Sequence, residues 1–329
     1  MSPRAAAVAL LTLTAGCDGC GPPEGEPQPT FTSTPPPATV ASGRAAVAAS
    51  DADVAGSLPA SELTWQFADT PAGALDVVIH LPPRRPNERF PVLLAFHGRG
   101  EAMKGPKRGA RGWVDDYWLP RAEQRLFAPP LASTDLQRLV AGSRLDAMNE
   151  ALAARPYRGL IVVCPYTPDI LAGTRSLDAA SAFGGWLTQT LVPRVRRETP
   201  ALDNRSATGI DGVSLGGRLS VLVGLERPDT FGVVAGLQAA FDSAEAPELA
   251  RRAREARDRH PFTLRLLSSE GDFFLRATRS IGRALAERSI EHRLDVVPGP
   301  HDYDFNRGPG VYEMLLFHDR ALRGEAYEL

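Results

Sequence analysis

One short stretch constrains this chain more than any other: a serine flanked by small residues between an apolar strand and an apolar helix. The stretch is Gly212-Val213-Ser214-Leu215-Gly216. A serine at the tip of such a strand-to-helix turn must adopt a strained backbone, so the residues two before and two after it must be small. The pattern predicts that Ser214 projects its hydroxyl from a sharp turn. The alternative is a serine in an ordinary glycine-rich turn.

Strand-like and helix-like segments alternate from about residue 62, which predicts an α/β fold with a mainly parallel sheet and helices on both faces. The first two strands are joined by a Pro-Ala-Gly turn and are expected to form an antiparallel pair. The eight expected strands are 63–67, 75–81, 92–96, 160–164, 208–212, 232–236, 263–267 and 294–297.

Amphipathic or apolar periods also predict helices over 178–197, 246–259, 276–288 and 310–322. The connection from 99 to 158, between the third and fourth strands, is too long for a simple crossover. It contains the aromatic residues Trp113, Tyr117 and Trp118, and helical parts near 121–127 and 145–154. Two interpretations stay open for this insertion: a lid or substrate wall over a site, or a second patch of core.

The first seventeen residues differ from the rest of the chain. Arg4 precedes an apolar run that is too short to span a bilayer, and small residues lead up to Cys17. This segment, 1–17, resembles a bacterial lipoprotein signal, which implies that Cys17 is lipidated and that the protein is exported and anchored to a membrane, facing the periplasm or the cell surface. An ordinary secretory signal and a cytoplasmic chain are the alternatives.

Residues 18–58 are rich in Pro, Ala, Gly, Ser and Thr and have no helical or strand period. Such a segment cannot bury enough apolar surface to fold, so it is predicted to be an extended tether. The folded domain is then expected over 59–329. Cys164 lies in an apolar strand and is interpreted as a buried structural thiol.

Charge and residue spacing exclude several classes of partner. The formal net charge is −2, and the 35 arginines are scattered among acidic residues, so no basic stripe indicates nucleic acid. Cys and His spacings indicate no zinc site, and no metal or organic cofactor is implied. We expect membrane contact through the lipid anchor only. The oligomeric state is not predicted.

A serine hydroxyl needs a base to become a good nucleophile. His301 lies in a Gly/Pro loop after the last strand, and the other five histidines fit this role less well. The imidazole in turn needs a carboxylate to hold its tautomer. Asp272 follows the seventh strand and is the first choice; Glu270 and Asp242 remain open.

Negative charge developing on a substrate oxygen needs backbone donors. The N–H of Leu215, at the start of a helix, is one candidate. The loop His97-Gly98-Arg99-Gly100 follows the third strand, and its glycines allow close backbone approach, so the N–H of Arg99 is the second candidate. A plain tight turn is the alternative for this loop.

Together the serine turn, the His97-Gly98 loop, Gly271-Asp272 and the loop that ends at His301 resemble the esterase D branch of the α/β-hydrolases, which includes feruloyl and enterochelin esterases. The resemblance covers roughly 75–320 and departs from compact members at the insertion. It implies a serine esterase acting on a small-molecule or polymer-linked ester, with Ser214, Asp272 and His301 as triad. A thioesterase or peptidase on the same fold, or an inactive binding module, are the alternatives.

Overall fold

The computed structural model describes residues 57–171 and 176–329. The expected signal at 1–17, with Cys17, and nearly all of the expected tether at 18–58 lie outside the described residues. Within them, Leu58 already pairs with Arg84 in an isolated β-bridge. None of the described helices is long and apolar enough to cross a membrane.

One eight-stranded sheet organises the described residues, as the sequence predicts. The strand order is β1-β2-β4-β3-β5-β6-β7-β8. The β1–β2 and β2–β4 pairs are antiparallel and all other pairs are parallel. The strands are β1 Ser61–Phe67, β2 Leu75–Leu81, β3 Val92–Phe96, β4 Ile161–Pro165, β5 Thr208–Gly212, β6 Val233–Leu237, β7 Thr263–Gly271 and β8 Arg293–Pro300.

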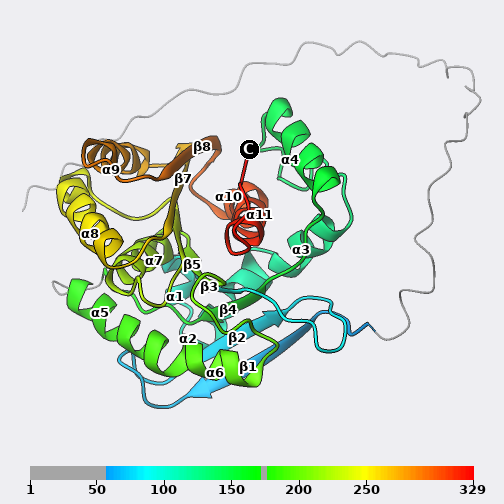
Figure 1. The fold of residues 1–329 in the computed structure, drawn as a ribbon, viewed down its shortest axis with the longest axis horizontal. Helices are drawn as coiled ribbons and strands as arrows, with labels where there is room; N and C mark the ends of the chain where they lie inside the picture. The colour runs from blue at the N-terminus through cyan, green and yellow to red at the C-terminus, as the bar shows by residue number, and fades with distance from the viewer. Residues whose placement is uncertain (1–56, 172–175) are drawn as a thin grey trace, which may run out of the picture. The chain divides into compact units, whose positions relative to one another are not determined.

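Helices cover both faces of this sheet (Figure 1). One face packs against α5 Ser176–Trp186, η3 Leu187–Leu191, α6 Val192–Glu198, α7 Leu215–Glu226, α8 Ala246–Arg259 and α9 Leu275–Glu287. The other face packs against the insertion and α11 Val311–Ala321. Short helical turns η4 Ser243–Glu245, α10 Tyr303–Phe305 and η5 Asn306–Gly310 lie in the connections.

Side chains that alternate along the central strands belong to two layers of core, one on each face of the sheet. In β3, Leu94 and Phe96 belong to the cluster under α5 to α9, whereas Leu93 and Ala95 belong to the cluster under α11. Successive strand side chains point to opposite faces, so a strand buried on both faces must be apolar throughout. This explains the continuous apolar runs in the sequence.

The insertion between β3 and β4 contains α1 Arg99–Ala102, α2 Pro106–Gly109, the π-helical turn η2 Gly112–Asp116, α3 Leu119–Phe127 and α4 Gly142–Ala154. Trp113 and Tyr117 are buried in the core cluster beneath α11, together with Met148 and Leu152 of α4. Much of the insertion is therefore core that covers one face of the sheet. Its first residues also border the cavity described below.

Candidate active site

Ser214 occupies the sharp turn between β5 and α7. Its backbone angles are φ 57° and ψ −114°, a region that L-residues rarely adopt. A Cβ on Gly216 would lie 2.3 Å from the Phe96 carbonyl oxygen, and one on Gly212 would lie 2.6 Å from the Gly216 carbonyl. Only glycine fits at these two positions. A strained serine held in place by its surroundings is typical of a functional position.

His301 and Asp272 meet beside this turn. The Nδ1 atom of His301 lies 2.8 Å from Oδ1 of Asp272, whose carboxylate is fully buried. Asp272 also accepts hydrogen bonds from the Ser268 hydroxyl at 2.6 Å and from the Phe274 N–H at 2.9 Å. Because a carboxylate can only accept, Nδ1 of His301 carries the proton and Nε2 of the neutral ring is free to act as a base.

The two competing acids lie elsewhere. Asp242 accepts the N–H of Ala244 and forms a capping box with Glu245 at the start of η4. Glu270 is exposed at the end of β7. Of the three carboxylates considered from the sequence, Asp272 is the one that contacts His301.

Ser214 and His301 border the same cavity, which has a volume of about 200 Å³. The rest of its wall comes from the loop and helix after β3, which include Glu101, from Tyr117 of the insertion, from Val213, and from the residues after His301, which include Tyr303 and Asn306. A Cβ on Gly98 would lie 3.8 Å from the Cβ of Ser214, so the loop after β3 runs directly beside the serine.

The two expected oxyanion donors flank this cavity. Leu215 is the first residue of α7 and Arg99 the first of α1. Within the described part of the chain, neither backbone N–H donates a hydrogen bond, so both remain available to a ligand. The side chain of Arg99 pairs with Asp169 at 2.8 Å.

His97 supports this loop, a role that sequence reasoning missed. The N–H of Thr167 donates to Nε2 of His97 at 2.9 Å, so the proton sits on Nδ1, which donates to the Gly98 carbonyl at 2.9 Å. Burial lowers the pKa of His97 to about 4, which keeps the ring neutral near pH 7. His97 therefore orients the backbone of Gly98 next to Ser214.

Aromatic rings flank His301. The ring of Phe273 stacks on the imidazole with centroids 4.1 Å apart and planes 32° apart, and Phe274 makes an edge contact at 5.4 Å. Phe273 is nevertheless 70% exposed. An exposed apolar ring held against the candidate base forms a surface on which a substrate group can pack.

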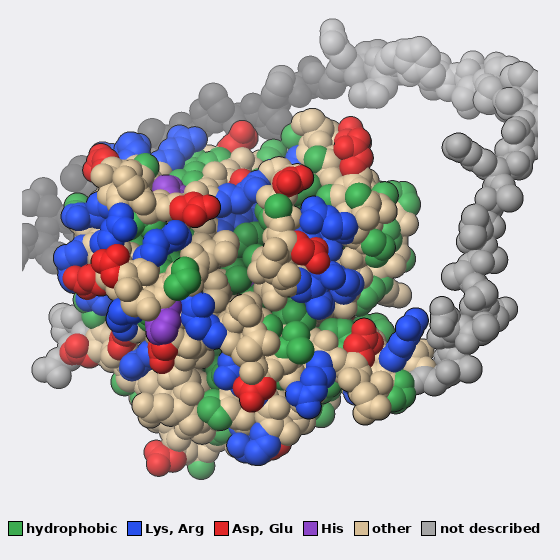
Figure 2. Space-filling view, viewed as in Figure 1, with side chains coloured by type: hydrophobic (Ala, Val, Ile, Leu, Met, Phe, Trp, Pro, Cys, Tyr) green, Lys and Arg blue, Asp and Glu red, His purple; other side chains and the backbone are tan. Residues whose placement is uncertain are grey.

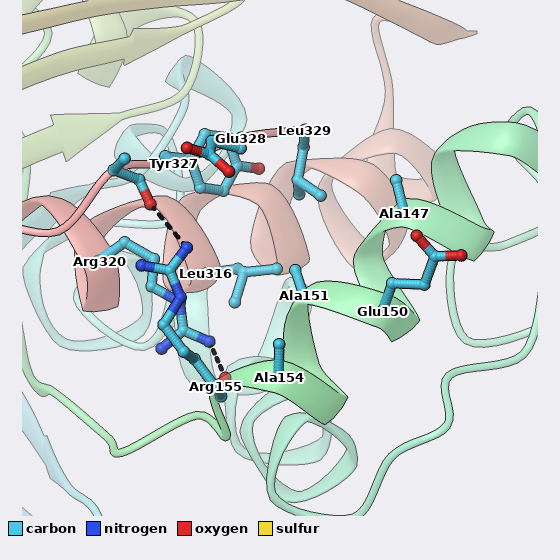
Figure 3. A pocket seen from close by; sticks show the side chains of 11 residues that line it. Ala147, Glu150, Ala151, Ala154, Arg155, Leu316, Arg320, Tyr327, Glu328 and Leu329 are labelled. Carbon is cyan, nitrogen blue, oxygen red and sulfur yellow. Dashed lines mark hydrogen bonds between the residues drawn. The ribbon is translucent and has the colours of Figure 1, made fainter.

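A second hollow, of about 260 Å³, lies between α4, α11 and the C-terminal residues (Figure 3). Its arginines already have partners: Arg155 donates to the Ala326 carbonyl, and Arg320 donates to the carbonyls of Arg155 and Pro156. It shares no residue with the Ser214 cavity. No group of three or more His, Cys, Asp or Glu side chains in residues 57–171 and 176–329 is arranged to hold a metal ion.

Comparisons with known proteins reveal the fold. No family model matches the sequence, and no curated protein matches it. Among solved structures, the chain is similar to an S-formylglutathione hydrolase from Staphylococcus aureus, with 12% identity over 79% of this chain and 99% of that one and a TM-score of 0.56.

Two further structures are similar to the chain. One is a mutant feruloyl esterase module from Clostridium thermocellum complexed with sinapinate, with 16% identity over 82% of this chain and 91% of that one and a TM-score of 0.56. The other is an enterobactin esterase from Shigella flexneri, with 16% identity over 79% of this chain and 59% of that one and a TM-score of 0.50. With its eight-stranded, mostly parallel sheet flanked by helices, the chain has the α/β-hydrolase fold.

Proposed function

We propose that the protein is a serine hydrolase of carboxylic esters. The observation that carries this proposal is the hydrogen bond of His301 to buried Asp272 while His301 borders the same cavity as Ser214. The names of the similar structures, which include esterases, support it.

The chemistry follows from the positions of the groups. Nε2 of His301 takes the proton of the Ser214 hydroxyl as its oxygen attacks the ester carbonyl. Asp272 accepts from Nδ1 and stabilises the imidazolium that forms. The backbone N–H groups of Leu215 and Arg99 donate to the oxyanion, and each such donor contributes about 3 kcal/mol to lowering the barrier.

Collapse of this intermediate releases the alcohol, which takes its proton from His301 and leaves an acyl group on Ser214. Water, deprotonated by His301, then attacks the acyl carbonyl carbon. As the bond from this carbon to the Ser214 oxygen breaks, that oxygen takes the proton back from His301 and the acid is released. The substrate is a small-molecule or polymer-linked ester that reaches the cavity of about 200 Å³. The residues named for these steps need no metal or organic cofactor.

We also propose that the protein is exported and held at a membrane by lipid on Cys17. The support is the sequence of the first seventeen residues. The folded part adds no separate argument for membrane contact on the face drawn in Figure 2, where positively and negatively charged side chains are interspersed. Cys17→Ser is expected to abolish metabolic labelling with palmitate, and a label that persists would contradict the anchor.

The test of the hydrolase proposal compares wild type with Ser214→Ala on nitrophenyl acetate, butyrate and ferulate, beside a thioester and a peptide. We expect ester hydrolysis by wild type that falls by about 10⁴-fold or more in the variant. Ser206→Ala, at an exposed serine in the loop before β5, serves as the matched control and is expected to keep the wild-type rate. Equal rates for wild type and Ser214→Ala on every substrate would contradict the proposal.

A further inference from the structure

A buried carboxylate, Glu101, borders the Ser214 cavity but takes no part in the chemistry above. Its residue is 2% exposed and lies on α1, two residues after Arg99. Oε2 accepts a short hydrogen bond from the Tyr117 hydroxyl, and Oε1 accepts one from the Tyr303 hydroxyl at 2.5 Å. Lys104 lies 3.5 Å from Oε1. Burial of a polar group is unfavourable unless it is hydrogen-bonded, and Glu101 has a partner for each carboxylate oxygen.

Tyr117 joins Glu101 to the loop after β3. Its hydroxyl oxygen accepts the N–H of Gly98 at 3.1 Å while its proton goes to Glu101. Burial raises the pKa of Tyr117 well above its usual value, so the phenol stays protonated. The direction of the two hydrogen bonds, from Gly98 to Tyr117 and from Tyr117 to Glu101, is therefore fixed. Gly98 is the residue just before the candidate oxyanion donor Arg99. The insertion therefore supplies a second contact to Gly98, at its N–H, while His97 contacts its carbonyl.

Tyr303 joins Glu101 to the loop that carries His301. It lies two residues after His301, and a Cβ on Gly100 would lie 3.5 Å from its hydroxyl. Its ring also packs near that of Tyr117, with centroids 5.9 Å apart. One carboxylate thus accepts from two tyrosines that are far apart in the sequence, one in the insertion and one after β8.

We propose that Glu101 is a positioning residue that ties the oxyanion loop to the histidine loop through Tyr117 and Tyr303. The inference rests on the proposed ester hydrolysis. Stabilisation of the oxyanion requires the Arg99 N–H and the His301 imidazole to hold their places around one carbonyl carbon. A displacement of about 1 Å in such an arrangement costs about 100-fold in rate.

The test replaces Glu101 with Gln. The amide can accept at only one of its two terminal atoms, so one tyrosine loses its acceptor and meets a donor instead. We expect kcat to fall about 10- to 100-fold, while KM changes little. The affinity of phenylboronic acid, which forms a tetrahedral adduct with the serine, should fall by a similar factor.

Two further variants separate positioning from folding. Tyr303→Phe removes one bond at a partly exposed residue and should lower kcat less than Glu101→Gln while the melting temperature stays close to that of wild type. The kcat loss in the double variant Glu101→Gln/Tyr303→Phe should be smaller than the product of the two single losses, because both residues belong to one hydrogen-bond network.

Glu123→Gln provides the matched control. Glu123 is another buried carboxylate of the insertion, bonded to His80 at 2.6 Å and not bordering the cavity. We expect a lower melting temperature with unchanged kcat. Two outcomes would overturn the positioning role if the wild type is active. In the first, Glu101→Gln leaves kcat and the boronate affinity unchanged. In the second, both glutamine variants lose kcat in proportion to the fall in their melting temperatures. A wild type that hydrolyses no ester would instead overturn the proposed function.

Discussion

The Nδ1 atom of His301 lies 2.8 Å from Oδ1 of Asp272, although 29 residues separate them in the sequence. β7 and β8 are parallel neighbours, so the loops that follow them emerge at the same edge of the sheet. β5 ends at this edge as well, and Ser214 after it borders the same cavity as His301. The topology of the sheet thus brings Ser214, Asp272 and His301 to one edge from three separate parts of the chain.

Asp272→Asn tests the role of this contact. An amide at this position can present a donor to the Nδ1 side and favour the wrong tautomer of His301, so we expect kcat to fall by about 10⁴-fold with a native fold. Steady-state kinetics measure the loss. Glu270→Gln and Asp242→Asn are the controls, and an equal loss in either would mean that the acid has been misassigned.

Gly216→Ala tests the packing of the serine turn. The new methyl group would lie 2.3 Å from the Phe96 carbonyl oxygen and 2.6 Å from that of His97, both of which are backbone atoms. We expect a loss of about 1–3 kcal/mol or more in the free energy of unfolding, measured by urea denaturation, together with loss of activity. Gly142→Ala, where the methyl group meets nothing within 4 Å, should be tolerated. Equal stability of the two variants would contradict the packing argument.

His97 makes the stability depend on pH. Its pKa is lowered by burial to about 4, whereas in the unfolded chain it is ~6.5. Between these values the unfolded chain takes up a proton that the folded chain does not bind. The contribution of His97 to the free energy of unfolding is therefore complete above pH ~6.5 and is lost as the pH falls toward 4. This loss is on the order of 3 kcal/mol.

Urea unfolding of wild type and His97→Asn across this pH range measures the effect. The variant should be less stable near pH 7 but lose less stability on acidification, because the residue that titrates is gone. If the free energy of unfolding changed with pH in the same way for both proteins, His97 would be ruled out as the source of the pH dependence.

Phe273→Ala tests the exposed ring on His301. Because Phe273 is 70% exposed, its loss should hardly change the melting temperature. Without the Phe273 ring, substrate groups lose an apolar surface on which to pack. We therefore expect kcat/KM for aromatic and long-chain esters to fall by about 2- to 10-fold. An unchanged kcat/KM across a panel of acyl groups would show that substrates do not use this surface.

Much of this arrangement was predictable from local sequence. The ends of β2, β3 and β5 match the expected ranges, because each apolar run stops at Pro, His or Gly. β7 was predicted to end at Leu267 but continues to Gly271. Ser268 and Ser269 have little intrinsic strand preference and are held in the strand by pairing with β8, a long-range contact that local sequence does not reveal.

Other features depend on contacts between distant residues. The expected helix over 178–197 is three consecutive segments, with the π-helical turn η3 shortly before Pro193. Proline has no N–H to donate to the regular hydrogen bonds of an α-helix. The cluster around Glu101 was missed because Tyr303 lies 202 residues away. Sequence alone also left Asp272, Glu270 and Asp242 as alternatives, since all three follow strands or lie in loops.

The role of Ser214 is tested most directly by labelling the purified protein with a fluorophosphonate and locating the adduct by peptide mass spectrometry. We expect a single adduct on Ser214, lost in Ser214→Ala and formed much more slowly in a variant that lacks the His301 imidazole. A protein that takes up no label, or carries it on another residue with Ser214 unmodified, would contradict the claim that Ser214 is the nucleophile.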